Sequence, residues 1–127
     1  MLLVDAANVV GSRPTGWWRD RAGAAGKLVD NIRAAVAAAK LAPPVVVVLE
    51  GAARRGATDG EDGGVTVVHA PGEGDETVVS VAEAATDAVT LVSADRALAD
   101  QCRALGCDVV GPRWLLDRLS ASLPSNP

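Results

Sequence analysis

The sequence predicts a single α/β domain with a mostly parallel central sheet of about five strands. Short apolar segments alternate along its 127 residues with longer segments of helical periodicity, which is the pattern of β-α-β units. One of these segments, Val45–Leu49, is apolar at every position, as in a central parallel strand covered on both faces. The chain is long enough to bury one core and shows no internal repeat or linker. We therefore expect one domain over residues 1–119, followed by a flexible C-terminal tail over residues 120–127.

The first half of the chain predicts two strands and one long helix. Leu2–Val4 is a short apolar strand that stops at Asp5. The glycines and the proline of Gly11–Gly16 favour a loop. From about Trp18 to Lys40, apolar residues recur at steps of three and four, which predicts an amphipathic helix. Val45–Leu49 then forms the second strand.

The middle of the chain alternates between flexible and regular segments. Gly51–Gly64 contains five glycines and few apolar residues, so we expect a mobile surface loop. Val65–His69 is the third strand, and a second helix should begin at Asp75, placed at or near its N-cap. Val89–Val92 is the fourth strand.

The last third of the chain predicts two helices around a short strand. A third helix follows Ser93-Ala-Asp-Arg96 and runs to about Leu105, with Gly106 as the glycine that closes it. Val109 and Val110 form the fifth strand, and Pro112 opens the last helix. The polar segment from Ser120 onward should fray.

The composition excludes several classes of protein. A formal net charge of -4 argues against a simple basic nucleic-acid-binding module. Cys102 and Cys107 have no zinc-ligand spacing and are expected to be reduced, partly buried thiols. No apolar stretch approaches the roughly 18 residues that a membrane span needs, so we expect no membrane association and a cytoplasmic location.

Four acidic residues occupy equivalent places in the predicted sheet. Asp5, Glu50, Asp75 and Asp95 each follow a strand or begin the helix after it. Because the carboxyl ends of parallel strands meet at one edge, these carboxylates should converge there. Their repulsion would be relieved by a hard divalent cation such as Mg²⁺ or Mn²⁺, which supports phosphodiester hydrolysis. Each acid also has a simpler interpretation: Asp75 and Asp95 as helix N-caps, and Glu50 as a solvated strand end.

Basic and aromatic residues gather near the same edge. Seven of the twelve basic residues fall in connections that leave it: Arg13, Arg19, Arg21, Arg54, Arg55, Arg96 and Arg113. Their guanidinium groups suit phosphates, although any one of them could simply lie on a solvated loop. Trp17 and Trp18 could stack on unpaired bases, and we expect only one of them to be exposed. The single histidine, His69, is more easily explained as a packed residue than as a catalytic base.

The order of these motifs resembles a known family. Leu3-Val-Asp5-Ala-Ala-Asn8, then Val-Val-Leu-Glu50-Gly, then Gly-Glu-Gly-Asp75-Glu-Thr, then Val-Ser-Ala-Asp95-Arg96 are similar to the NYN branch of the PIN-like ribonucleases, in particular its bacterial YacP-like subgroup. The resemblance spans Leu2 to about Leu116. It implies a PIN-like, Rossmannoid three-layer sandwich that uses Mg²⁺ or Mn²⁺ on single-stranded or structured RNA. Two positions depart from the family pattern, with Ala7 in place of an aromatic residue and Glu50 in place of an aspartate.

The positions of the candidate residues and the resemblance together suggest a role for each of them. Asp5, Asp75 and Asp95 would be metal ligands, directly or through water, and Glu50 would be a ligand or the base that aligns water. Asn8 would position metal or substrate; otherwise it caps an Asx-type turn. Glu76 could replace or assist its neighbours. Independently of the resemblance, the position of the basic residues near this edge predicts phosphate binding by Arg13, Arg54, Arg55 and Arg96.

We therefore expect a metal-dependent (endo)ribonuclease with RNA as its partner, and a homodimer stays an open alternative. A non-catalytic RNA-binding or protein-interaction module on the same fold is the main alternative function. A phosphatase acting on a small metabolite is a third hypothesis, but it would require a second acid two residues after Asp5, where the chain has Ala7.

Overall fold

The computed structural model of the chain describes residues 1–13 and 16–122. In chain order the elements are β1 (Leu2–Asp5), α1 (Ala6–Gly11), the 3-10 helix η1 (Trp17–Arg19), α2 (Arg21–Ala37), β2 (Val45–Leu49), the 3-10 helix η2 (Gly51–Gly56), β3 (Gly60–Asp62), β4 (Val65–His69), α3 (Gly74–Ala84), β5 (Thr90–Val92), α4 (Arg96–Ala104), β6 (Asp108–Val110) and α5 (Pro112–Ser122). Within the described residues none of these helices is long and apolar enough to cross a membrane.

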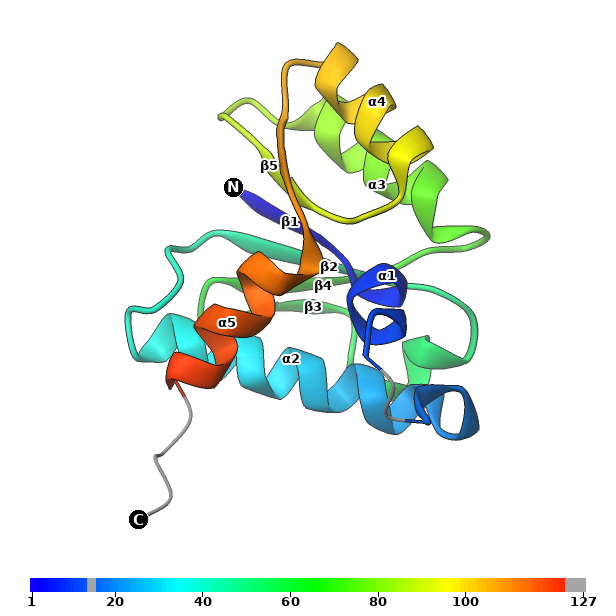
Figure 1. Cartoon of the computed structure of the whole chain (residues 1–127), viewed down its shortest axis with the longest axis vertical. Coiled ribbons are helices and arrows are strands. Elements are labelled where there is room, and N and C mark those ends of the chain that lie inside the picture. Colours follow the sequence, from blue (N-terminus) through cyan, green and yellow to red (C-terminus); the bar gives the residue numbers. More distant parts are fainter. Residues whose placement is uncertain (14–15, 123–127) are drawn as a thin grey trace.

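The strands form one sheet in the order β3-β4-β2-β1-β5-β6. All neighbouring strands are parallel except β3, which pairs antiparallel with β4. The central strand β1 lies between β2 and β5, so the chain crosses over after β4 to reach the other half of the sheet (Figure 1). The predicted α/β class with a mostly parallel sheet is confirmed, with six strands among the described residues rather than about five.

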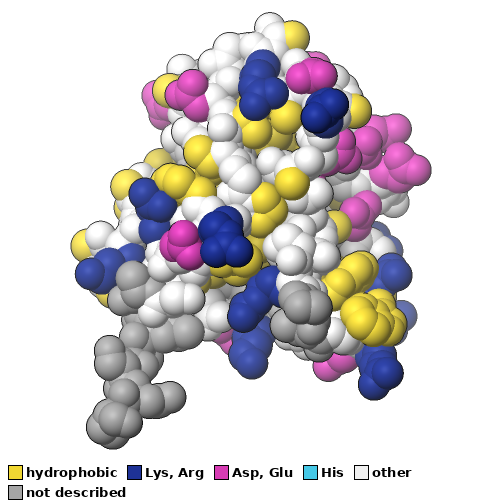
Figure 2. Space-filling model, viewed as in Figure 1, with side chains coloured by type: hydrophobic (Ala, Val, Ile, Leu, Met, Phe, Trp, Pro, Cys, Tyr) yellow, Lys and Arg dark blue, Asp and Glu magenta, His cyan; other side chains and the backbone are white. Residues whose placement is uncertain are grey.

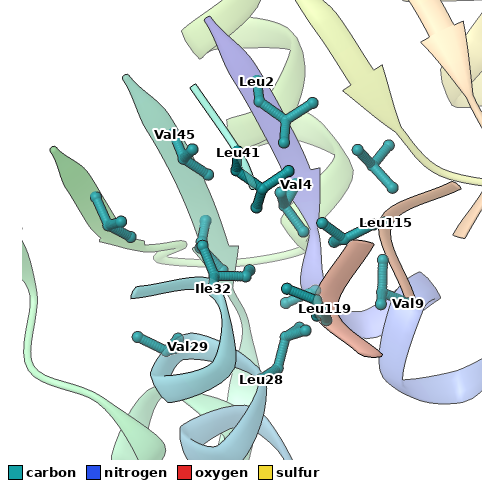
Figure 3. Close-up of a cluster of buried hydrophobic side chains, with 14 of the residues drawn as sticks. Leu2, Val4, Val9, Leu28, Val29, Ile32, Leu41, Val45, Leu115 and Leu119 are labelled. Carbon is teal, nitrogen blue, oxygen red and sulfur yellow. The ribbon is translucent and has the colours of Figure 1, made fainter. Parts of the chain in front are cut away.

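Helices cover both faces of the sheet and make it the middle of three layers. On one face, α1, α2 and α5 pack over Leu2, Val4 and Val45 (Figure 3). On the other face, α3 and α4 pack over Leu3 and Val46 (Figure 1). Alternate residues of β1 and β2 therefore enter opposite cores, which explains why β2 is apolar throughout and β1 is apolar up to Asp5.

The glycine-rich segment Gly51–Gly64 differs from the expected loop. It holds η2 and the edge strand β3, which turns directly into β4 through Gly63 and Gly64. Both glycines have positive φ angles, 61° and 85°, as a two-residue hairpin turn requires. The prediction of an irregular segment was wrong because every residue of β3 is exposed and leaves no apolar pattern, whereas its order comes from backbone pairing with β4.

The helix boundaries also differ from those expected. The predicted helix from Trp18 to Lys40 is divided, because Asp20 caps a new helix by accepting a hydrogen bond from Gly23 N at 2.8 Å. A short helix, α1, follows β1 directly and was not predicted, and it contains the first residue of the expected loop Gly11–Gly16, of which residues 14–15 lie outside the described residues. Helix α5 continues to Ser122, beyond the predicted tail boundary, and residues 123–127 lie outside the description.

Candidate active site at the carboxyl edge of the sheet

The carboxyl ends of β1, β2 and β5 and the start of α3 bring the predicted acids to one place. Asp5 is the last residue of β1, and its register with Val48 of β2 places Glu50 just beyond it on the neighbouring strand. A pocket of about 450 Å³ opens at this edge. We call it the acidic pocket, and its lining residues are Asp5, Ala7, Asn8, Glu50, Glu73, Asp75 and Asp95.

Asp5 is half-buried and is held by two hydrogen bonds. Its Oδ2 accepts from the Ser93 hydroxyl at 3.0 Å, and its Oδ1 accepts from Asn8 N at 3.4 Å. Burial raises the pKa of Asp5, these two hydrogen bonds oppose the rise, and the nearby carboxylates of Glu50 and Asp95 add to it. The carboxylates of Glu50 and Asp95 are thus close enough to Asp5 to interact with it electrostatically.

Ser93 joins Asp5 to the predicted site residue Asp95. The Ser93 hydroxyl also accepts from Asp95 N at 3.1 Å, and the Asp95 carboxylate caps α4 by accepting from Leu98 N at 3.1 Å. The N-cap interpretation of Asp95 therefore holds together with its place in the pocket. Sequence reasoning missed Ser93, which is only 3% exposed. A serine directly after an apolar strand and two residues before an acid was the available signal.

Asn8 connects two distant segments and does not cap a turn. Its Oδ1 accepts from Ala94 N at 2.7 Å, across a separation of 86 residues. The Nδ2 group of Asn8 makes no hydrogen bond to any described residue. It is therefore a free donor beside the carboxylates of the acidic pocket. Asn8 therefore fixes the turn that carries Ser93 and can also donate to an anion in the pocket.

Glu50 reaches across the pocket to the start of α3. Its Oε2 accepts from Gly74 N at 2.6 Å, which satisfies a free N–H of the helix and places negative charge at its N-terminus. The contact is close: a Cβ on Gly74 would lie 3.1 Å from Glu50 Cδ. Asp75 lies near the N-cap of α3, as predicted, but it is not the capping residue, because α3 begins at Gly74 with Glu73 as the N-cap residue.

Asp75 and Glu73 form the exposed side of the acidic pocket. Asp75 lies in the first turn of α3, where its Oδ1 accepts from Glu76 N at 3.0 Å. Glu73 was not predicted, because its place depends on the path of the β4–α3 connection. Glu76 is exposed and is not among the lining residues, so geometry favours Glu50 over Glu76 as a site residue.

The donor set suits a hard cation that keeps part of its water shell. Carboxylate and amide oxygens are ligands that Mg²⁺ prefers, and Mg²⁺ in proteins commonly uses one or two carboxylates and several waters. Among the described residues no three Asp, Glu, His or Cys side chains are grouped closely enough to hold a metal ion. The oxygen atoms that line the acidic pocket are of the kind that a hydrated divalent ion uses. Simultaneous ligation by Asp5, Asp75 and Asp95 stays a prediction.

The predicted phosphate-binding arginines lie outside the acidic pocket. Arg54 has a structural role, because its Nε donates to Gly51 O at 3.1 Å and its Nη1 to Ala70 O at 3.5 Å. Arg55 and Arg96 are exposed, and Arg13 lines a separate cavity.

Only one of the two tryptophans is exposed, as expected, and His69 is packed, as expected, whereas stacking of bases on the tryptophans stays a prediction. Trp18 is 56% exposed, whereas Trp17 is half-buried, with the Arg21 guanidinium 5.5 Å from its ring. The half-buried His69 is within hydrogen-bond distance of Ala57 O, at 2.8 Å from Nε2, and packs at the end of β4.

No family model and no curated protein sequence matches the chain. Solved structures share its fold. Rae1 (YacP) from Bacillus subtilis has a TM-score of 0.73 and 18% identity, covering 96% of this chain and 74% of that one. A tryptophan-to-leucine mutant of the same protein gives a TM-score of 0.71, also at 18% identity, covering 95% and 74%. The chain is thus similar in fold to these proteins.

Proposed function

We propose that the chain is a divalent-metal-dependent ribonuclease that hydrolyses RNA phosphodiester bonds in the acidic pocket. The observation that carries the proposal is the convergence of Asp5, Glu50, Asp75 and Asp95 on one pocket from segments far apart in sequence. These are the acids in the motifs that resemble the YacP-like subgroup. The solved structures that share the fold are also named YacP, which supports the same assignment.

Each residue of the site has a distinct role in this proposal. Asp5 and Asp95 would hold Mg²⁺ or Mn²⁺, directly or through water, with Asp75 completing the set from the exposed side. The bound ion would neutralise the phosphate and lower the pKa of an attacking water. Glu50 would accept a proton from that water or orient it, and Asn8 Nδ2 would donate to a phosphate oxygen. Ser93 is a positioning residue, because its hydroxyl fixes the Asp5 carboxylate.

The proposal is tested by Asp5→Asn, assayed on defined single-stranded and hairpin RNAs with Mn²⁺ and with chelator. We expect cleavage to fall at least a hundredfold, because removing one preorganised electrostatic group typically costs that much. Asp87→Asn is the matched control, since Asp87 is exposed before β5 at the opposite edge of the sheet. Cleavage that survives in the Asp5 variant would sink the assignment.

The alternative is a non-catalytic module that binds RNA on the same fold. The feature that favours it is that no three acids among the described residues form a compact ligand set. It predicts that wild-type protein shifts RNA in a gel but leaves it intact at every Mn²⁺ concentration. Cleavage of RNA that is lost in Asp5→Asn excludes this alternative.

A further inference from the structure

A second cavity lies beside the acidic pocket, between three helices on one face of the sheet. It has a volume of about 770 Å³ and is lined by α1, α2, α5 and the residues just after α1. We call it the α1–α2–α5 cavity. Val9, Leu28 and Leu119 line it, are almost fully buried and lie close together (Figure 3); we call these three side chains its apolar floor. The cavity therefore combines an apolar floor with a size in the usual range for small-ligand sites, about 300–1,000 Å³.

The rim of this cavity carries an excess of positive charge. Arg13, Lys27 and Arg113 line it, against one acid, Asp117. Within the part of the chain that the structure describes, the sole ion pair joins Arg103 and Asp100, so no carboxylate there neutralises the three cations directly. Lys and Arg side chains appear on this face, over α2 and α5, while Asp and Glu side chains gather where α3 begins (Figure 2). The cavity is thus suited to an anion.

Only a thin wall separates the cavity from the acidic pocket. Asn8 lines the acidic pocket, and the next two residues of α1 line the cavity; likewise Asp95 lines the first and Ala94 the second. The hydrogen bond from Ala94 N to Asn8 Oδ1 forms part of this wall. The two sites are therefore close enough to receive neighbouring units of one extended ligand.

We propose that the α1–α2–α5 cavity binds a phosphate-bearing nucleotide of the RNA strand, next to the bond cleaved in the acidic pocket. The inference rests on the proposed function for the identity of the strand. The phosphate contacts Lys27, Arg13 and Arg113, while the ribose or base lies over the apolar floor. A single nucleotide enters a cavity only when it is unpaired, so the substrate class is single-stranded RNA or a loop.

The test measures RNA binding with chelator present, so that no cleavage is needed. A fluorescent single-stranded 12-nucleotide RNA is titrated by anisotropy at several salt concentrations against Lys27→Ala, Arg113→Ala and the double variant. The matched controls are Lys40→Ala and Arg103→Ala, which remove the same charges from exposed positions remote from the cavity. Circular dichroism melting of each variant establishes that the fold is unchanged.

Each cavity variant should weaken binding about five-fold at 0.1 M salt and reduce the logarithmic salt slope by ~0.7, as expected for one lost phosphate contact on a single strand. The double variant should lose about 25-fold, and the controls less than two-fold. A blunt RNA duplex should show no difference between cavity and control variants.

Equal losses in cavity and control variants would overturn the inference, as would equal losses on the duplex. Saturable binding of free AMP without binding of the oligonucleotide would point to a small-nucleotide site and also overturn it. The proposed function can fail independently of this binding site. If the wild-type protein never cleaves RNA with Mn²⁺, but the cavity variants bind RNA more weakly than the wild type and the controls do, the binding site stands and the ribonuclease assignment falls.

Discussion

The ionised Asp5 side chain lowers the stability of the folded protein, and the same carboxylate is a proposed metal ligand. It lies at the end of the central strand, half-buried, and its charge is opposed by burial and by the carboxylates of Glu50 and Asp95. Its two hydrogen bonds lower the pKa but do not cancel the rise. Burial and the neighbouring carboxylates therefore make the ionised form of Asp5 less favourable in the folded protein than in water.

We predict that Asp5→Asn makes the metal-free protein more stable at neutral pH. The asparagine side chain keeps an oxygen that accepts from the Asn8 N–H and places its amide nitrogen beside the Ser93 hydroxyl. It removes the negative charge that Glu50 and Asp95 repel. At pH 7 in chelator, a gain of ~1 kcal/mol would raise the melting temperature by about 3 °C for a domain of this size.

The stability gained by Asp5→Asn should depend on pH. Because the folded pKa of Asp5 is raised above its ordinary value of 3.8, the folded wild type binds the proton more tightly than the unfolded chain. Wild-type stability from this group is thus fully present below pH 3.8 and falls as the pH rises through the folded pKa. The advantage of the variant should shrink as the pH approaches 4, and an advantage independent of pH would contradict the assigned cause.

The contact between the end of β2 and the start of α3 determines where the Glu50 side chain points. The helix begins at Gly74, whose N–H donates to the Glu50 carboxylate, and the lack of a Cβ lets that carboxylate approach. Gly72, two residues earlier, has no atom within 4 Å of its would-be Cβ and no positive φ. An added methyl group would therefore crowd Glu50 at position 74 but would meet no other atom at position 72.

We predict that Gly74→Ala reduces cleavage while Gly72→Ala does not. The new Cβ would press on Glu50 Cδ at 3.1 Å and displace the carboxylate by a few tenths of an ångström. Since misplacing a catalytic group by about 1 Å can cost a hundredfold, we expect a loss of about tenfold in kcat. Steady-state cleavage with Mn²⁺ measures this, and equal rates for both variants would show that the Glu50 position is not critical.

Some strands and helices could be predicted from the sequence, and others could not. The strands β1, β2 and β4 were predicted within one residue because short, mainly apolar segments mark buried strands. The edge strand β3 was missed because it is exposed throughout, and α1 because six residues do not establish a period.

The site could be predicted in part for a related reason. Parallel topology alone brings the ends of β1, β2 and β5 together, so the acids that follow them were foreseeable. The contacts of Ser93 and Gly74 were not, because they depend on the turn after β5 and on the path of the β4–α3 connection.

The whole molecule divides its charge between two neighbouring regions. Acids gather at the carboxyl edge of the sheet, and cations surround the α1–α2–α5 cavity, although the net charge is -4 (Figure 2). A cation in the acidic pocket would relieve the repulsion between Asp5 and its neighbours and would prepare this edge for a phosphate. Metal and RNA should therefore bind cooperatively.

We predict that Mn²⁺ raises the melting temperature of the wild type and of Asp87→Asn, but much less that of Asp5→Asn. Binding only to the folded state adds about 2.7 kcal/mol when the free metal is at a hundred times Kd, which corresponds to about 10 °C here. Differential scanning fluorimetry over a Mn²⁺ series measures it. The shift should be smaller at pH 5 than at pH 8, since a proton on Asp5 competes with the cation. An equal shift in the Asp5 and Asp87 variants would place the ion outside the acidic pocket, and no shift in the wild type would leave the non-catalytic module as the better account.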